Sequence, residues 1–326
     1  MKSFDVLTIG SATQDVFIQS KMLEEQKDSH APDGIDACIP LGSKLGIDEL
    51  TFATGGGATN AAVTFAHFGL KTTCVARVGD DMTAEMIMSD LKREHVDTSH
   101  IKRAKGEKSA YSIILVAGSG HRGILTHRGA SQYLDARDLP RNVKPAWIYG
   151  TSFGGNARLL ESVFALAYRT GAKLAWNPGA GELALGFARL APYLRRTDVL
   201  ILNKEEAGEL AGLPSRHAPG VMRKIATSLK GVLIVTHGEH GAYAYAHGTT
   251  WFVGTLKGQR VNTTGAGDAF GSGLVGALAK GKRLDVALRT GALNAHGVIT
   301  HMGAKVGILK GFPGILFLKK VPLKQL

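Results

Sequence analysis

Two cysteines, Cys38 and Cys74, are all that the 326 residues contain, and no apolar run reaches the roughly 18 residues of a membrane-spanning helix. Two cysteines are too few for a disulfide framework or a zinc site. The first residues read as a buried strand with an early aspartate, Asp5, whereas a secretory signal needs a longer apolar core. We therefore expect a soluble cytoplasmic protein that makes no contact with a membrane.

Two nucleotide-binding motifs are also missing. The chain has no G-x-x-x-x-G-K-[ST] sequence, so it has no Walker A loop. A G-x-G-x-x-G sequence does occur at residues 118–123, but it lies between two predicted strands, 109–117 and 123–128. The dinucleotide fingerprint requires a helix after the glycines, so we assign this motif to a hairpin turn. A nicotinamide-dependent dehydrogenase is correspondingly disfavoured.

The charge is unbalanced, with 39 lysine and arginine residues against 27 acidic ones and a net charge of +12. Nucleic-acid binding calls for basic residues that cluster and alternate with aromatics. Here they are dispersed in short groups such as Arg195-Arg196 and Lys319-Lys320. We therefore predict no nucleic-acid partner and relate the positive field to small polyphosphate substrates.

What the chain does contain is a regular alternation of short apolar runs and helical segments, in a composition that is 44% hydrophobic and 20% charged. This alternation predicts an α/β fold with a mostly parallel sheet and helices on both faces. Ligands of such sheets bind beyond the carboxyl ends of the strands. The predicted strands are 6–9, 73–78, 146–149, 174–176, 199–202 and 233–236, and the predicted helices are 59–68, 83–94, 157–169, 205–211, 220–229 and 268–280.

Two stretches, 14–54 and 109–128, break the alternation with strands that do not suit the parallel sheet. We place them in a small β lid built from about residues 11–56 and 105–131. Since the lid is not contiguous in sequence, residues 1–326 are predicted to form a single domain. The tail, residues 319–326, is expected to be disordered.

A glycine-rich stretch at residues 261–281 begins like a loop and continues like a helix, with apolar residues at helical spacing from Ala269 and a glycine cap at Gly281. The segment Gly265-Ala266-Gly267 then lies at the N-terminus of a buried helix. The first amides of a helix have no intrahelical partner, and the helix dipole is positive there. The segment is therefore predicted to bind an anion, which glycine lets the backbone approach closely.

Asp268 follows this turn and admits two interpretations. A carboxylate in the first turn of a helix is favoured by the dipole, so Asp268 can serve simply as a helix-terminal charge. Alternatively, it lies beside an anion site to take the proton from a hydroxyl group that attacks a phosphoryl group. The local pattern leaves both interpretations open.

A second glycine cluster, Gly55-Gly56-Gly57, precedes another small-residue helix about two hundred residues earlier. Together, residues 55–81 and 261–274 resemble the N-terminal and C-terminal signatures of the ribokinase-like (PfkB) family of carbohydrate and nucleoside kinases. The resemblance covers nearly the whole chain. It implies a Rossmann-like αβα sandwich with a β-sheet lid, and the transfer of the γ-phosphate of ATP to a hydroxymethyl group, with Mg²⁺ as a cofactor.

The resemblance also implies roles for individual residues. Asp268 corresponds to the catalytic base, and the amides of Gly265, Ala266 and Gly267 to the anion hole. The remaining correspondences are Asn203 and Glu206 for Mg²⁺ and phosphate (Glu206 indirectly for the metal), Thr236 and Gly238 for the nucleotide, Asn294 for the adenine pocket, and Asp15, Gly56, Gly57 and Asn60 for the acceptor.

Taken one at a time, several of these residues have simpler explanations. Asn203 can cap the helix that follows it, because asparagine is a preferred N-cap residue. Asp15 alone reads as a solvated residue at a strand end, and Asn60 as a residue at a helix start. It is the ordered combination of all these residues that favours a kinase over a non-catalytic sugar- or nucleotide-binding protein.

One departure from the family pattern is Asn262, which stands where the family usually has an aspartate that helps to bind a monovalent cation. An amide oxygen can coordinate potassium but brings no negative charge. We therefore predict that potassium activation is weak or absent.

The acceptor is predicted to be uncharged, because the first glycine cluster lacks the lysine found there in the ribokinase and phosphofructokinase branches. We favour a free sugar, with a nucleoside as the alternative, while Arg128 keeps an acidic sugar open. Lids of this type can pair, so a homodimer through the lid is a further hypothesis. A nucleoside base would need an apolar slot, for which the lid offers Phe17, Ile39, Phe52 and Tyr111.

Overall fold

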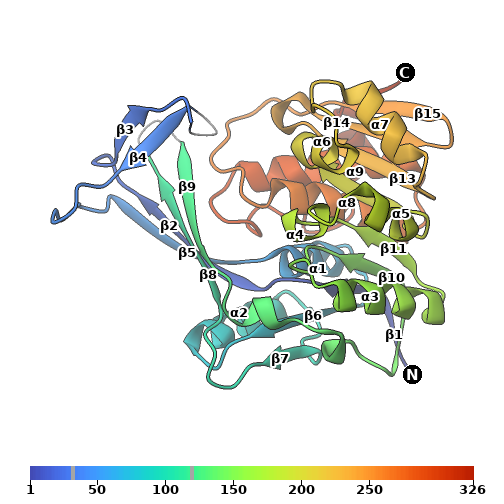
Figure 1. Ribbon diagram of the computed structural model, residues 1–326, viewed down its shortest axis with the longest axis horizontal. Helices are drawn as coiled ribbons and strands as arrows, with labels where there is room; N and C mark the ends of the chain where they lie inside the picture. Colours follow the sequence, from blue (N-terminus) through green and yellow to red (C-terminus); the bar gives the residue numbers. More distant parts are fainter. Residues whose placement is uncertain (31–33, 118–120) are drawn as a thin grey trace.

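The computed structural model describes residues 1–30, 34–117 and 121–326, and the body of the protein is built around one large sheet (Figure 1). In these residues ten strands form that sheet. The spatial order is β7 (Ile101–Arg103), β6 (Thr72–Val78), β1 (Lys2–Ile9), β10 (Val143–Gly150), β11 (Lys173–Trp176), β12 (Val199–Asn203), β13 (Val232–Thr236), β14 (Ala242–Ala246), β15 (Thr249–Val253) and β16 (Leu323–Gln325). From β7 to β13 in this spatial order, neighbouring strands run parallel. The last three strands, β14 to β16, each run antiparallel to the strand before them.

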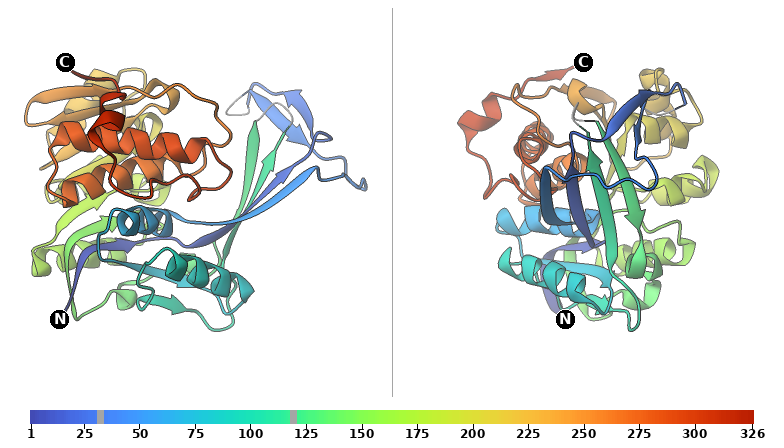
Figure 2. Two further views of the ribbon diagram at one scale, coloured as in Figure 1. Left: turned by 180° about the vertical axis from the view of Figure 1, so that it is seen from behind. Right: turned by 90° about the vertical axis from the view of Figure 1, so that its left-hand side faces the viewer.

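Helices cover both faces of this sheet (Figures 1 and 2), because alternate strand residues point to opposite sides. In β1, Leu7 packs with one group of helices and Val6 with the other. The first group is α3 (Ala157–Thr170), α4 (Ala180–Leu183), α5 (Phe187–Leu194), α6 (Lys204–Ala211) and α7 (Ala218–Ala226). The second group is α1 (Gly57–His67), α2 (Met82–Arg93), α8 (Ala266–Ala279), α9 (Leu284–Ile299) and α10 (Ile315–Lys319). Three short 3₁₀ turns join elements in the described residues, η1 (Gly129–Tyr133), η2 (Ala136–Asp138) and η3 (Gly238–His240).

A smaller sheet projects from the body on one side (Figures 1 and 2). Its strand order is β5 (Glu49–Gly55), β2 (Thr13–Gln19), β8 (Ala110–Val116) and β9 (Arg122–His127). A separate hairpin of β3 (Glu24–Lys27) and β4 (Ile35–Cys38) lies at its far end. The predicted pairing of β8 with β9 is confirmed. Residues 118–120, part of the glycine motif that we assigned to the turn, lie outside the described residues.

These observations confirm an α/β fold with a mostly parallel sheet and a small second sheet. The prediction of a disordered tail was wrong. Residues 323–325 form β16, which pairs with β15 along the edge of the large sheet, and the amide of Leu326 donates to the carbonyl of Thr250 at 2.9 Å. Main-chain pairing of this kind leaves no mark in the composition of a short basic tail. No helix in the described part of the chain is long and apolar enough to span a bilayer.

Candidate active site

The N-terminus of α8 is shaped by Gly265, which is the N-cap residue and has φ 79°. This left-handed conformation favours glycine, and a Cβ at this position would lie 2.5 Å from the Cβ of Ala304. The helix begins at Ala266, two residues before its predicted start, so Gly267 and Asp268 both lie in its first turn. The amide of Ala266 donates to the carbonyl of Thr263 at 3.2 Å. That bond occupies one of the three amides predicted for the anion hole.

Asp268 is held by a residue from the other glycine-rich segment. The Nδ2 atom of Asn60, on α1, donates to Oδ2 of Asp268 at 2.9 Å, across 208 positions of sequence. Burial raises the pKa of Asp268; the Asn60 hydrogen bond partly offsets this, and the charge of Asp15 adds to it. The structure thus brings together Asp268 and two of the residues predicted for the acceptor.

The acceptor residues are packed by close backbone approaches. Gly56 has φ 99°, and a Cβ there would lie 2.5 Å from the carbonyl oxygen of Ser11. The carboxylate of Asp15 on β2 lies against Gly55, where a Cβ would come within 2.0 Å of Oδ2. Gly57 donates its amide to Oγ of Ser11 at 3.2 Å. The three glycines therefore let the start of α1 approach the base of the lid.

Asp15 and Asn60, the two polar side chains predicted to bind the acceptor, do not use all of their hydrogen-bonding capacity within the described residues. Asp15 is buried and accepts a hydrogen bond from Oγ1 of Thr13 at 3.1 Å. Burial raises the pKa of Asp15, while hydrogen bonds from Thr13 and Ser112 and the charge of Lys305 lower it in part. Among the described residues, the Oδ1 atom of Asn60 is buried without a partner. A ligand hydroxyl group would satisfy that atom.

A cleft of about 180 Å³ lies at the N-terminus of α8. It is lined by two of the predicted anion-hole residues, Ala266 and Gly267, and by both residues predicted for the nucleotide turn, Thr236 and Gly238. Its remaining walls are largely apolar, as a nucleotide base requires. They include Val253, Leu256, Phe270, Ala292 and Ile299.

The prediction for Asn294 was wrong, because the structure does not place this residue in the cleft. Its side chain is fully buried between α8 and α9, where Nδ2 donates to Oγ1 of Thr64 at 3.1 Å and to the carbonyl of Ala269 at 2.8 Å. Its Oδ1 atom accepts from the amide of Leu309 at 3.0 Å. The face of α9 that lines the cleft carries Ala292 and other residues instead, so the expected position was off by a fraction of a helical turn.

Asn203 and Glu206 form a capping box at the start of α6. Oδ1 of Asn203 accepts from the amide of Glu206, and Oε2 of Glu206 accepts from the amide of Asn203, both at 2.8 Å. Burial raises the pKa of Glu206; the hydrogen bond from Asn203 lowers it in part, and nearby carboxylates, Asp268 among them, raise it further. The charges of Glu206 and Asp268 are therefore close enough to interact.

A magnesium ion fits this arrangement because Glu206 is a half-buried carboxylate whose charge interacts with that of Asp268. Mg²⁺ is commonly held by one or two carboxylates, several waters and substrate phosphates rather than by an all-protein cage. Glu206 is the residue that would take this part, directly or through water. In the described residues no group of three or more His, Cys, Asp or Glu side chains could hold a metal.

Two contacts of the site had no signal in the sequence. Nη1 of Arg122, on lid strand β9, donates to Oδ1 of Asn262 at 3.1 Å, and the amide of Thr264 donates to the same atom at 3.1 Å. Lys305, in the loop after α9, is buried near Asp15. Both basic residues come from segments that local patterns do not connect to the glycine clusters.

A helix N-terminus suited to an anion, with a half-buried carboxylate beside it and a largely apolar cleft next to it, is typical of enzymes that transfer phosphoryl groups. The sequence profile of the pfkB family of carbohydrate kinases matches residues 41–310. The chain therefore belongs to this family. It is therefore a kinase with an alcohol group as acceptor. Kinases of this family use ATP and Mg²⁺.

Individual relatives differ in their acceptors. The chain is 25% identical to a ribokinase of Haemophilus influenzae over 78% of this chain and 84% of that protein. It is 29% identical to an adenosine kinase of Schizophyllum commune over 74% of this chain and 78% of that protein. A solved structure of adenosine kinase from Sinorhizobium meliloti superposes with a TM-score of 0.78 at 22% identity, covering 94% of this chain and 97% of that one. The ribokinase fold with its lid is thereby confirmed.

Proposed function

We propose that this kinase transfers the γ-phosphate of ATP to a hydroxymethyl group of an unphosphorylated sugar. The observation that carries the proposal is the hydrogen bond from Asn60 to Asp268, which joins the acceptor-binding segment to the carboxylate beside the amides of α8. An acceptor held by Asp15 and Asn60 then lies next to Asp268, and a nucleotide in the neighbouring cleft presents its terminal phosphate to the same helix end.

The chemistry follows from these positions. Asp268 accepts the proton of the acceptor hydroxyl group while the hydroxyl oxygen bonds to the γ-phosphorus; the bond from that phosphorus to the β–γ bridging oxygen breaks, and ADP leaves. The amides of Gly265, Ala266 and Gly267 and the α8 dipole stabilise the charge on the transferring oxygens. For Ala266 this requires its bond to Thr263 to yield to the phosphoryl oxygen. Glu206 would hold Mg²⁺, directly or through water, and the bound metal would supply positive charge to the phosphates.

Binding of the nucleotide is assigned to Thr236, Gly238 and Asn203. Gly56 and Gly57 allow the acceptor to approach the main chain, and the lid excludes water, which would otherwise compete as an acceptor. We take residues 1–326 as one domain, with the lid drawn from about 11–56 and 105–131, and the cytoplasm as the place of action.

The preference for an uncharged sugar rests on the acidic and amide character of the acceptor residues. Asp15 and Asn60 suit hydroxyl groups, whereas an existing phosphate would need cations. Arg128, the residue considered for an acidic sugar, is exposed and precedes η1. A non-catalytic binding role is disfavoured because Asp268 and its glycines are all present.

The alternative is a nucleoside acceptor, whose base needs an apolar slot. The register of the lid strands shows that two of the four residues predicted for this slot lie on the wrong face. Opposed residues of paired strands lie on one face, and Tyr111 pairs with Gln14 and Phe52 with Val16. Tyr111 and Phe52 therefore lie on the face of the lid opposite to Asp15, and their predicted place in a base slot was wrong.

Phe17, one of the residues predicted for the base slot, does share the face of Asp15, together with two other apolar residues. Phe17 follows Asp15 by two positions, Ile114 pairs with Phe17, and Ile124 pairs with Ile114. Phe17 and Ile114 are buried and Ile124 is half exposed. This inner apolar surface is the observation that keeps a nucleoside as the second candidate, whereas Ile39 is exposed on the far hairpin.

A panel of acceptors tests the proposal. ATP is offered with ribose, fructose, adenosine, inosine and cytidine, and ADP release is measured for each. We expect acceptor-dependent ADP release with one of the free sugars. Release with a nucleoside alone would select the alternative, and no acceptor-dependent release from the whole panel would contradict both.

A further inference from the structure

Three consecutive residues in the loop after α9 contact three different parts of the protein. Gly303 lies against Ala53 of lid strand β5, where a Cβ would approach the Ala53 Cβ to 3.3 Å. Ala304 packs on Gly265 at the N-terminus of α8. Lys305 reaches back to β5 and α2. This loop therefore touches both the anion-binding helix end and the strand that leads from the lid into the glycine cluster.

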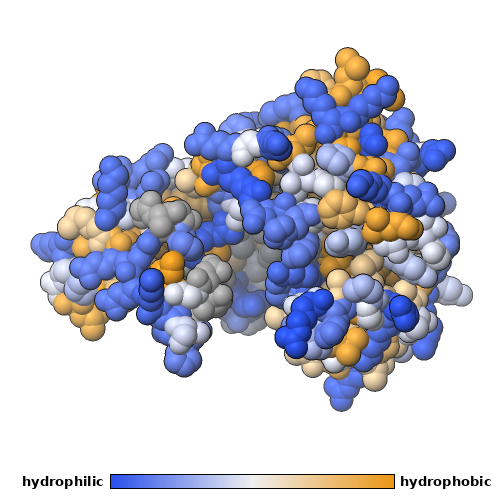
Figure 3. Space-filling model, turned by 90° about the horizontal axis from the view of Figure 1, so that it is seen from above, coloured by the Kyte–Doolittle hydropathy of each residue, from blue (hydrophilic) through white to orange (hydrophobic). Residues whose placement is uncertain are grey.

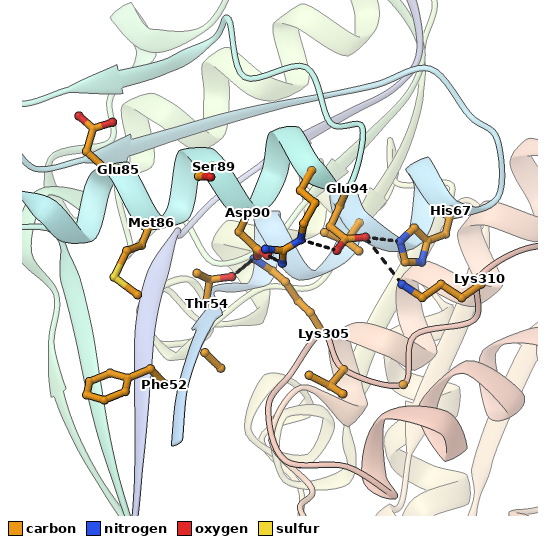
Figure 4. Close-up of a pocket in the computed structure, with 15 residues that line it drawn as sticks. Phe52, Thr54, His67, Glu85, Met86, Ser89, Asp90, Glu94, Lys305 and Lys310 are labelled. Carbon is orange, nitrogen blue, oxygen red and sulfur yellow. Dashed lines mark hydrogen bonds and ion pairs between the residues drawn. The ribbon is translucent and has the colours of Figure 1, made fainter. Parts of the chain in front are cut away.

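Lys305 connects the loop to β5 and α2 through its side chain (Figure 4). Its side chain is only 9% exposed, and its Nζ atom donates to Oγ1 of Thr54 at 2.7 Å and pairs with Oδ2 of Asp90 at 3.2 Å. The hydroxyl group of Thr54 donates to Asp90 as well, and Arg93 forms an ion pair with the other oxygen. Asp90 is thus the common acceptor of three groups from β5, α2 and the loop.

This network lines a cavity of about 660 Å³ whose walls come from β5, α1, α2 and the loop after α9 (Figure 4). Lys310, from the same loop, also lines the cavity, and its Nζ atom lies 3.9 Å from Oε2 of Glu94. Lys310 is 82% exposed, in contrast to Lys305. The two lysines therefore offer a matched pair, one integral to the network and one at its edge.

A buried ion pair is a weak source of net stability, because the cost of removing two charges from water offsets much of their attraction. It does fix geometry, since each charge needs its partner within bonding distance. Here the geometry that is fixed matters to the site. Thr54 directly precedes Gly55, on which Asp15 packs, and the charge of Lys305 offsets a small part of the rise that burial causes in the pKa of Asp15.

We propose that Lys305 is a positioning residue, whose bonds to Asp90 and Thr54 hold the acceptor-binding end of strand β5 in register with the anion-binding end of helix α8. This inference rests on the proposed function. Lys305 acts through Ala304 on Gly265 and through Thr54 on the neighbour of Asp15, and it touches neither substrate.

The first test compares Lys305→Met, the double variant Lys305→Met with Asp90→Leu, and the control Lys310→Met. The double variant replaces both charges of the pair by apolar groups, and the exposed Arg93 keeps its ion pair with Glu94, so we expect it to fold even where the single variant does not. We expect the double variant to show a KM for the acceptor raised about tenfold and a kcat lowered about tenfold or more, because small misplacements of reacting groups are costly. The dissociation constant for ATP and all parameters of Lys310→Met should match the parent. Parent-like kinetics in the folded double variant would overturn the proposal.

A second readout does not depend on turnover. Amide hydrogen exchange is measured on the free protein at residues 49–55 and 263–268. We expect the double variant to accelerate exchange in both segments together, and Lys310→Met in neither. Acceleration in only one segment, or in none, would show that Lys305 does not couple them. If the parent phosphorylates no acceptor, the proposed function fails while this measurement still decides on the coupling.

Discussion

At the scale of single residues, the chemistry depends on one half-buried carboxylate, Asp268, and on the groups that set its pKa. Burial in the site raises the pKa of Asp268 above the ordinary value for aspartate, and the amide of Asn60 works against that rise by donating to the charged form. A base must be deprotonated to act. Activity is therefore present above the pKa of Asp268 and is lost as the pH falls through it.

This balance gives a prediction with opposite signs for two variants. Asn60→Leu removes the donor, so the acid limb of the kcat–pH profile should move to higher pH. Asp15→Asn removes a nearby negative charge, so the limb should move to lower pH, although acceptor binding suffers. If the acid limb of the kcat–pH profile stayed unchanged in both variants, that limb would not reflect the ionisation of Asp268.

A second residue-scale prediction concerns Asn262, where the family usually has an aspartate. Its Oδ1 atom already accepts from Arg122 and from the amide of Thr264, and an amide brings no negative charge to a cation. We expect KCl to cause no saturable stimulation beyond that of choline chloride at equal ionic strength. A large saturable stimulation by potassium would contradict this expectation.

At the scale of elements, the site depends on how α8 begins. Gly265 and Gly267 are two residues apart but differ in what a methyl group would meet. A Cβ on Gly265 would clash with Ala304 and require a positive φ, whereas nothing lies within 4 Å of one on Gly267.

The pair therefore predicts opposite effects on stability. Gly265→Ala should lower the free energy of unfolding by at least about 1–3 kcal/mol, because a non-glycine residue is strained in this conformation. Gly267→Ala, inside the helix, should leave it unchanged or raise it by up to about 1 kcal/mol. Urea unfolding followed by circular dichroism measures both. Equal effects of the two substitutions would show that the start of α8 is not built as described.

Much of this element-scale organisation was predictable from the sequence, because buried parallel strands and amphipathic helices leave periodic patterns. The start of α8 was placed two residues late, since Ala266 and Gly267 have no periodicity of their own. Asn294 was assigned to the adenine pocket by the family resemblance alone, and a shift of one or two positions along a helix moves a side chain to another face. β16 was missed because an edge strand is defined by its neighbour's main chain.

At the scale of the whole molecule, the lid has an inner and an outer face. The outer face carries exposed apolar side chains from the two edge strands, β5 and β9: Leu50, Phe52 and Leu125 are 48%, 55% and 60% exposed. Apolar residues also gather at the far end of the lid, on the left of Figure 3. Contiguous apolar surface of this kind is typical of interfaces. We therefore retain the hypothesis of a homodimer through the lid.

Sedimentation equilibrium at micromolar concentration tests the dimer. The parent should sediment as a dimer, and Phe52→Ser with Leu125→Ser as a monomer. Ile315→Ser with Leu316→Ser, which changes equally exposed residues on α10, serves as the control and should leave the dimer intact. A monomeric parent would refute the hypothesis.

Long-range contacts set the limit of what the sequence could reveal. The approach of Asn60 to Asp268 spans 208 positions and was expected only from the family resemblance. The contacts of Arg122 with Asn262 and of Lys305 with Asp90 were not expected at all, because each joins segments without a shared local pattern. The register that turns Phe52 and Tyr111 outward likewise depends on pairing across strands.

The most direct test of the account is the substitution Asp268→Asn, with phosphoryl transfer and ATP binding measured on the same preparation. Loss of the base should lower kcat by about 10²–10⁴, the range usual for general-base catalysis, while the affinity for ATP stays close to that of the parent. Undiminished transfer by the folded variant would return Asp268 to the role of a helix-terminal charge and contradict the proposed mechanism.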